Sequence, residues 1–424
     1  MIDRLRGCAA MAAVLMAVSC GGGVSGGSSG GTGGGGGGGG SAGNGGNPGG
    51  TPEQPTDDDA RRAVLADLGD KLILPTLQQL EAQAAALAVA VDALAAAPSS
   101  DAARAAAQAA WRNTMALVQR AEVLQIGPAA AITEPGGLGL QMQLQAFPQF
   151  DTCAIHTAAY ADQTVVAASP AERVGMGALE YVLFSDADDP ACAPPAGTNG
   201  QAKRAQYAVR LGAHIGAVAA QLRMAWAPDG GNFAGQFKTA GAGSTVYATP
   251  QAALNAVSTA IFSFEKNTKD RKIAAPTGIG ATDQPVCLRV SCPELLESRY
   301  ARNSGANVLA NLQAFRAVFT GADGGLGLNA LLQGVGRADL VARFATALEA
   351  AAAAVQAGTQ PDMETNVAEI PNRDACILAS TSLSGAPTVC QMHGRIRAVT
   401  QILRAEIVST LNLRIPDMSA GDND

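Results

Sequence analysis

The chain has 424 residues, of which 47% are hydrophobic, 15% charged and 4% aromatic. At about 150 residues per domain, this length allows two or three domains. The 29 basic and 36 acidic residues leave a formal net charge of −7, which argues against nucleic acid as a partner, because nucleic-acid-binding proteins usually carry a basic surface. Many of the 50 glycines are concentrated in residues 21–50, so the rest of the chain has an ordinary globular composition.

The N-terminus has the layout of a bacterial export signal. Arg4 and Arg6 precede an apolar segment, and Ala17-Val18-Ser19 leads to Cys20. This layout resembles the site at which lipoprotein signal peptides are cleaved. We therefore predict a signal peptide over residues 1–19, a lipid on Cys20 and a flexible Gly/Ser-rich linker over residues 20–58. The alternatives are ordinary signal cleavage without a lipid and a short membrane anchor.

The predicted lipid makes a membrane the first expected partner. It places the protein in the cell envelope, anchored to the outer membrane and facing the periplasm or the cell surface. No apolar stretch after residue 50 is long, bulky and charge-free enough to predict a membrane-spanning helix.

The number of cysteines is consistent with export. Cys8 would leave with the signal peptide and Cys20 would carry the lipid, so six of the eight cysteines remain. An even number of cysteines in an exported chain predicts disulfides, and the absence of a C-x-x-C motif argues against a metal site. Buried free thiols are the alternative. Short loops favour the pairs Cys287–Cys292 and Cys376–Cys390, which leaves the pair Cys153–Cys192.

From Asp57 onward the sequence is typical of helices. Apolar residues recur at helical spacing over residues 60–97, where Pro75 predicts a kink. Pro98 and Ser100 then end this helix and cap the next one. No segment alternates convincingly enough to predict a strand, and residues 286–290 come nearest. The remaining helices are expected over residues 101–125, 151–160, 171–184, 202–226, 250–272, 303–320, 326–332, 338–356 and 389–411.

These elements predict an all-α protein with two helical domains packed side by side. Each domain is long enough for a four-helix-type bundle, in which apolar stripes bury one another. The expected N-terminal bundle covers residues 59–226, the connection residues 227–248 and the C-terminal bundle residues 249–424.

Sequence motifs alone predict no catalytic residue. His156, His214 and His393 are isolated from one another, and no H-E-x-x-H motif is present. Each histidine is interpreted as a surface residue or a hydrogen-bonded core residue. The glycine run over residues 33–40 has low complexity and is not a nucleotide-binding loop.

Several segments, taken in their order along the chain, resemble the imelysin-like family of bacterial envelope proteins. Residues 173–184, with Gly175, Gly177 and Glu180, resemble the family's G-x-H-x-x-E-[YF]-L-L-F helix. The resemblance covers roughly residues 60–424 and implies an all-helical fold of two related bundles, an envelope location and a link to iron acquisition. It also implies a peptidase activity in some members. The other segments that carry it are residues 109–112, 120–122, 127–128, 145–151, 272–278 and 297–303.

The sequence departs from the family where the motif histidine is expected, because Gly177 occupies that position. In the family motif, histidine and glutamate lie three residues apart on one helical face and can present an imidazole and a carboxylate to one metal ion. Here only Glu180 is retained, so the resemblance to an iron or zinc site is incomplete. Glu180 is either a weak metal or ligand contact or a buried, hydrogen-bonded acid.

We therefore expect a binding or accessory lipoprotein, with a role in iron acquisition and without peptidase activity. Its partner beyond the membrane would be an unidentified small ligand, metal ion or envelope protein. The alternative is a metal-dependent peptidase of the imelysin type. The candidate residues of a binding groove are Trp111, Arg112, Glu122, Asp151, Gly175, Gly177 and Glu180.

Overall fold

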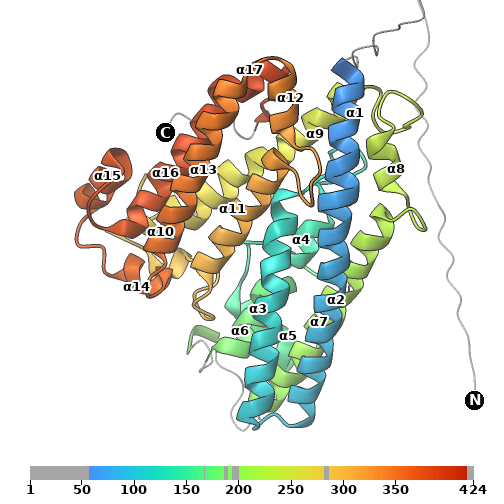
Figure 1. Cartoon of the computed structure of the whole chain (residues 1–424). Coiled ribbons are helices and arrows are strands. Elements are labelled where there is room, and N and C mark those ends of the chain that lie inside the picture. Colours follow the sequence, from blue (N-terminus) through green and yellow to red (C-terminus); the bar gives the residue numbers. More distant parts are fainter. Residues whose placement is uncertain (1–56, 167, 186–189, 193–199, 281–285, 418–424) are drawn as a thin grey trace, which may run out of the picture. The chain divides into compact units, whose positions relative to one another are not determined.

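The computed structural model describes residues 57–166, 168–185, 190–192, 200–280 and 286–417. All regular elements in these ranges are helical, which confirms the predicted all-α class (Figure 1). Residues 286–290, the nearest candidate for a strand, form no regular element. The predicted signal peptide, Cys20 and nearly all of the predicted linker lie outside the described residues.

The first helical stretch is continuous but changes its winding. It consists of α1 (Asp57–Asp67), the π-helix η1 (Leu68–Ile73) and α2 (Leu74–Ala96). Pro75 has no N–H to donate to the preceding turn, and the turn in front of it is the wider π-helix. The predicted kink near Pro75 therefore takes the form of a local change in helix type.

Residues 57–96 form a helical stretch that is long and apolar enough to cross a membrane, and no other helix in the described ranges passes this test. The sequence predicts no membrane-spanning helix after residue 50, so by length and composition this stretch differs from the expectation. Leu65, Leu80 and Leu87 from this stretch are fully buried in the protein core. A single buried leucine face is the pattern of a core helix in a globular protein.

The N-terminal half is built around α2, α3, α6 and α7, which pack against one another. Ser100 caps α3 as predicted, because its side chain accepts the N–H of Ala103 at 3.2 Å. Two elements here, α4 and α8, are only five and six residues long, too short for an apolar period to reveal them in the sequence. The elements of this half are α3 (Asp101–Val123), η2 (Gly127–Ala129), α4 (Leu140–Leu144), α5 (Thr152–Tyr160), η3 (Ala171–Arg173), α6 (Gly175–Phe184), η4 (Pro190–Cys192), α7 (Gly200–Trp226) and α8 (Phe233–Lys238).

The C-terminal half is built around α11, α13 and α16, with the π-helix η5 packed against α16. Most of the expected helices are present, and the sequence analysis missed α14 and α15. The elements are α9 (Pro250–Ser263), η5 (Phe264–Ala274), α10 (Ala275–Thr277), η6 (Pro293–Leu295), α11 (Ser304–Thr320), α12 (Leu328–Gly334), α13 (Ala338–Gly358), α14 (Met363–Ala368), α15 (Arg373–Ser382), α16 (Thr388–Ile402), η7 (Leu403–Ile407) and α17 (Val408–Leu411).

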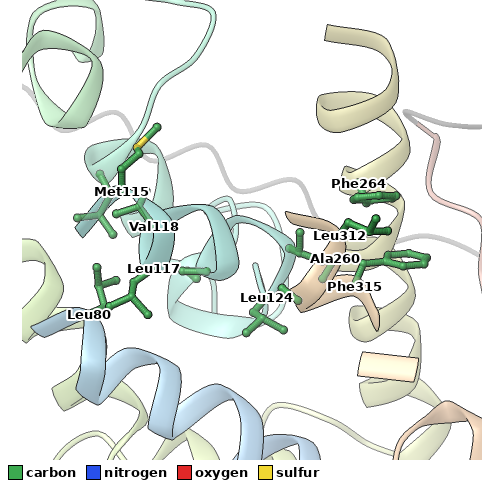
Figure 2. Close-up of a cluster of buried hydrophobic side chains, with 14 of the residues drawn as sticks. Leu80, Met115, Leu117, Val118, Leu124, Ala260, Phe264, Leu312 and Phe315 are labelled. Atoms are coloured by element: carbon green, nitrogen blue, oxygen red, sulfur yellow. The ribbon is translucent and has the colours of Figure 1, made fainter. Parts of the chain in front are cut away.

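The two halves share one apolar core. Helix α3 packs against α11, and α1 contacts α9 and α12. Figure 2 shows part of this core, with Leu80 and Met115 from the N-terminal half and Leu312 from the C-terminal half. Within it the rings of Phe264 and Phe315 stack with 4.5 Å between their centroids. Residues 54–424 form one compact unit, and the predicted domain boundary at residues 227–248 stays a prediction.

Three disulfides form among the described cysteines, and they are the three predicted pairs. Cys153–Cys192, Cys287–Cys292 and Cys376–Cys390 close sequence separations of 39, 5 and 14 residues. Such links stabilise a fold chiefly by restricting the unfolded chain, and stable disulfides are typical of oxidising compartments outside the cytosol.

Candidate functional site

The motif helix α6 begins with Gly175 and Gly177, which differ in backbone conformation and in the space around a Cβ atom. Gly175 has a φ of +75°, and a Cβ atom there would lie 2.5 Å from the carbonyl oxygen of Leu144. A Cβ atom on Gly177 would lie 3.4 Å from Oε1 of Gln145 and 3.9 Å from Phe150. The backbone therefore requires glycine at position 175, whereas position 177 has room for a Cβ atom.

Glu180 lies one turn further along α6 and is only 2% exposed. Its Oε1 accepts the backbone N–H groups of Tyr300 and Ala301 at 2.9 and 3.0 Å. Burial raises the pKa of the Glu180 carboxyl to about 8, although the N–H of Ala301 acts in the opposite direction. Glu180 therefore holds the chain segment in front of α11 against the motif helix, as a buried, hydrogen-bonded acid.

A buried lysine lies between two other carboxylates. Lys272, on η5, is 1% exposed, and its Nζ lies 3.1 Å from Oε2 of Glu297. It also pairs with Glu122 and donates to Gln119. Burial acts to lower the pKa of the Lys272 ammonium, but Glu122 and Glu297 outweigh it and raise that pKa above its ordinary value. Burial raises the pKa of the Glu122 carboxyl, against the effect of Lys272.

Amide side chains complete this arrangement. Oε1 of Glu297 accepts Nε2 of Gln119 and Nε2 of Gln145, both at 3.0 Å, and Oε2 accepts Nδ2 of Asn307 at 2.9 Å. Nζ of Lys272 donates to Oδ1 of Asn311 at 3.0 Å. A buried charge is tolerated when it is paired and hydrogen-bonded, and both conditions are met. We call the set the junction cluster; it consists of Gln119, Glu122, Gln145, Glu180, Lys272, Glu297, Asn307 and Asn311, and Glu180 is included because the charge of Glu297 also raises its pKa.

Gly177 joins the junction cluster through its backbone. Its N–H donates to Oε1 of Gln145 at 3.1 Å, and Nε2 of the same amide donates to Glu297. Gln145 therefore has a fixed orientation between the motif helix and the buried carboxylate. Position 177 contributes a backbone donor and no side chain to this contact.

The donor set of the junction cluster does not fit a metal ion. In the described part of the chain, no group of three or more His, Cys, Asp or Glu residues is arranged to hold one. The carboxylate oxygens of Glu297 accept amide N–H groups, and the ammonium of Lys272 lies where it neutralises Glu122 and Glu297. A cation placed among these carboxylates would meet the positive charge of Lys272.

The histidines are engaged elsewhere. Nε2 of His156 lies 2.6 Å from the hydroxyl oxygen of Tyr181, which follows Glu180 in α6. Nδ1 of His393 lies 2.9 Å from the hydroxyl oxygen of Ser380. His214 is buried on α7, and desolvation lowers the pKa of its imidazole. None of the three belongs to the junction cluster, so none replaces the motif histidine.

Trp111 and Arg112 lie beside the junction cluster on α3. The fully buried Trp111 donates its Nε1–H to the carbonyl oxygen of Met176 at 3.0 Å, which ties α3 to α6. The exposed Arg112 donates from Nη2 to the carbonyl oxygen of Ala301 at 3.3 Å. The peptide segment at Ala301 is therefore held by Glu180 on its N–H side and by Arg112 on its carbonyl side.

Asp151 lies outside the junction cluster. It is exposed and caps α5, because its carboxylate accepts the N–H groups of Cys153 and Ala154 at 2.8 and 3.0 Å. Among the candidates named from the sequence, Glu122 and Glu180 are cluster members, and Gly177 joins the cluster by one hydrogen bond. Trp111, Arg112 and Gly175 hold the surrounding helices and loops in place.

Sequence reasoning did not single out Lys272 or Glu297 as site residues, although both lie in segments that resemble the family. A lysine followed by the apolar run 273–276 was the available signal, because a lysine in such a run must find an anionic partner if it is buried. Gln119, Asn307 and Asn311 gave no signal, because single amides are common on helix surfaces, and Gln145, which follows α4, lies in a segment that resembles the family.

A second buried group of charges lies on the same π-helix. Oε2 of Glu265 accepts Nη2 of Arg404 at 2.7 Å, and Nζ of Lys269 lies 3.2 Å from Oδ1 of Asp270. Lys269 is 1% exposed. Helix η5 therefore carries buried charges toward η7 as well as toward the junction cluster.

An open hollow of about 520 Å³ lies where α2, α3 and α11 meet. Arg112 and Asn307 line it together with the small or apolar residues Ala116, Leu117 and Ala306. Asn307 is shared, because it lines the hollow and also donates to Glu297 of the junction cluster. We call this hollow the junction groove, and it is the candidate ligand site.

The chain matches the Peptidase M75 family model, described as Imelysin, over residues 73–382. A solved structure from Parabacteroides distasonis, provisionally designated an iron-regulated protein A precursor, is similar with a TM-score of 0.63 and 18% identity, covering 85% of this chain and 97% of that chain. An imelysin-like protein from Psychrobacter arcticum 273-4 is similar with a TM-score of 0.61 and 17% identity, covering 86% of this chain and 98% of that chain. No curated protein matches the chain. At these identities the two structures show a shared fold, and the family match over most of the sequence shows that the chain belongs to the imelysin family.

Proposed function

We propose that this chain is a lipid-anchored binding protein of the bacterial cell envelope that serves iron acquisition and does not hydrolyse peptides. The observation that carries the proposal is the use of Glu180, the retained motif carboxylate, to bind the N–H groups of Tyr300 and Ala301. Gly177 offers no side chain next to it. A hydrolytic metal centre uses about three protein ligands and an open position for water, and the junction cluster provides neither.

The envelope location and the link to iron rest on separate observations. The N-terminal signal pattern ending at Cys20 supports export and a lipid anchor. Three disulfides support an oxidising compartment. The similar protein from Parabacteroides distasonis is designated an iron-regulated precursor, which supports a role in iron acquisition for this chain.

The junction groove supports a binding role. Its volume of about 520 Å³ falls within the range of about 300–1,000 Å³ that is common for small-molecule sites. Asn307 is held in position by its hydrogen bonds to Glu297 and Ser298. A groove wall that is fixed before a ligand arrives costs less ordering on binding. The ligand would be a small molecule, a metal complex or a segment of an envelope protein.

A peptidase assay tests the proposal directly. The full chain, purified in nonionic detergent, is incubated with unfolded protein substrates, with and without added zinc or iron, beside a Glu180→Gln variant. We expect the same absence of cleavage in all samples. Metal-stimulated cleavage by the wild type that disappears in Glu180→Gln would contradict the proposal and support the peptidase alternative.

The anchor is tested by replacing the lipid acceptor. Cys20→Ala should remain unprocessed or be released from the membrane fraction, whereas the wild type should stay with the membrane and carry the mass of a lipid. An unchanged mass and unchanged fractionation in Cys20→Ala would exclude the lipid anchor.

A further inference from the structure

The junction groove contains a positive charge without a negative partner in the described part of the chain. Arg112 lines the groove and forms no ion pair with a described residue. By contrast, Lys272 of the junction cluster pairs with two carboxylates.

The guanidinium of Arg112 is held in place by neutral groups. It donates to the carbonyl oxygen of Ala301 at 3.3 Å and lies 4.7 Å from the centroid of the Phe184 ring. An arginine has five N–H donors in a planar fork that suits a carboxylate, and the contact with Ala301 uses one of its nitrogen atoms. The side chain is therefore oriented in advance and retains donors for an anion.

Apolar and amide side chains line the rest of the groove. Ala116 and Leu117 from α3 and Ala306 from α11 line it, and the small alanine side chains leave the space between the helices open. Asn303 and Asn307 lie at the α11 side and are hydrogen-bonded to each other at 2.9 Å. The groove thus combines one cation, five amide side chains (Gln79, Gln83, Asn113, Asn303 and Asn307) and an apolar wall.

We propose that the junction groove binds small organic carboxylates that have an apolar body. The carboxylate accepts hydrogen bonds from the guanidinium of Arg112, and the apolar body lies over Ala116, Leu117 and Ala306. This inference rests on the proposed function as a binding protein and specifies the class of its ligand. Inorganic anions would pair with Arg112 but would leave the apolar wall uncovered, so they should bind less tightly.

The chain offers a matched control for Arg112. Arg120 lies on the same helix about two turns later, forms no ion pair with a described residue and donates across the junction to Oε1 of Gln313 at 3.2 Å. It lines a separate hollow of about 220 Å³. Arg112→Gln and Arg120→Gln therefore remove the same charge from the same helix, but only Arg112→Gln removes it from the junction groove.

Calorimetric titration of the full chain in nonionic detergent tests the proposal, with 4-phenylbutyrate as the carboxylate probe and 4-phenylbutanamide as its neutral counterpart. We expect the carboxylate to bind at least about tenfold more tightly than the amide, the ratio that one good charge-assisted contact provides. Arg112→Gln should abolish this preference, Arg112→Lys should retain part of it and Arg120→Gln should retain all of it. The same titration with inorganic phosphate should give weaker binding than 4-phenylbutyrate.

A second variant keeps the test decisive if Arg112→Gln folds poorly. Ala306→Phe places a large ring in the groove at an exposed position and leaves Arg112 in place, so binding of both probes should be lost. Any of four results would overturn the proposal. Carboxylate and amide could bind equally, or the preference for the carboxylate could be unchanged in Arg112→Gln. The preference could also be lost equally in Arg120→Gln, or binding could be unchanged in Ala306→Phe. Metal-stimulated peptidase activity together with Arg112-dependent carboxylate binding would overturn the proposed function alone.

Discussion

The junction between the two halves contains two regions in which the positive charge of a side chain is compensated differently. In the junction cluster, Lys272 is 1% exposed and is surrounded by carboxylates and amides. In the junction groove, Arg112 is exposed and contacts a carbonyl oxygen and an aromatic ring. Helix α3 contributes to both regions, with Gln119 and Glu122 in the cluster and Arg112 in the groove.

Solvent explains the difference. A charge removed from water must be compensated by partners within the protein, whereas an exposed charge is compensated by water and ions. The junction cluster therefore stabilises the contact between the two halves, whereas the junction groove has a positive charge available for a ligand. The following predictions test this division, beginning with the largest expected effect.

Lys272→Met should destabilise the protein by about 3–5 kcal/mol, the usual result of breaking a buried ion pair on one side. The variant leaves Glu122 and Glu297 buried without their cation. Urea or guanidinium unfolding measures the effect. Lys266→Met is a suitable control, because Lys266 is also on η5 but pairs with Asp270 at 3.9 Å and does not belong to the junction cluster. A loss below about 1 kcal/mol in Lys272→Met would show that the cluster does not hold the junction together.

Glu180 should make stability fall as the pH rises from about 5 to 8. Its pKa is raised from 4.5 to about 8 in the folded state, so in this range the folded carboxyl keeps a proton that the unfolded chain has released. The unfolded state then binds fewer protons, and the free energy of unfolding falls with pH, with a limiting slope of about 1.4 kcal/mol per pH unit for one group. Glu180→Gln, which does not titrate, should flatten the curve.

Denaturant unfolding at several pH values measures this slope for Glu180→Gln and the wild type. Glu294→Gln provides a control at an exposed glutamate outside the cluster. Identical slopes for Glu180→Gln and the wild type would show that Glu180 is ionised in the folded protein at neutral pH.

The two glycines of α6 should respond to alanine with opposite signs. Gly177→Ala should stabilise the protein by about 0.5–1 kcal/mol, because alanine favours helices and the Cβ atom fits beside Gln145. Gly175→Ala should destabilise it by about 1–3 kcal/mol, because φ is positive there and the Cβ atom would meet the carbonyl of Leu144. Thermal unfolding of the pair measures both effects. Destabilisation by Gly177→Ala would mean that the cluster requires the absence of a side chain at position 177.

Arg112→Gln should destabilise the protein by no more than about 2 kcal/mol, less than Lys272→Met. It removes one hydrogen bond of 3.3 Å and one ring contact at an exposed position, each of which is worth about 1 kcal/mol or less. Denaturant unfolding beside Arg120→Gln gives the comparison. A loss as large as that of Lys272→Met would place Arg112 among the structural residues of the cluster.

Local physics made much of the fold predictable. The apolar period of residues 60–97, the cap at Ser100 and the interruption near Pro75 depend on neighbours within a turn or two, so they can be read from the sequence. Close spacing favoured Cys287–Cys292 and Cys376–Cys390, and the remaining cysteines then had one way to pair. The family resemblance was carried by short segments in a fixed order, and it led to Glu180 and Gly177.

Tertiary structure alone decided what those residues do. Glu122, Lys272 and Glu297 are far apart in the sequence, and helical periodicity does not say which helix will meet which. Gly175 and Gly177 are the same residue type two positions apart, yet only Gly175 has a positive φ and a carbonyl in the path of its Cβ atom. The sequence determined which residues can form helices and carry charge, because those properties are local. Their partners were decided by packing, because a buried charge is stable only where distant segments bring it an opposite charge or a hydrogen bond.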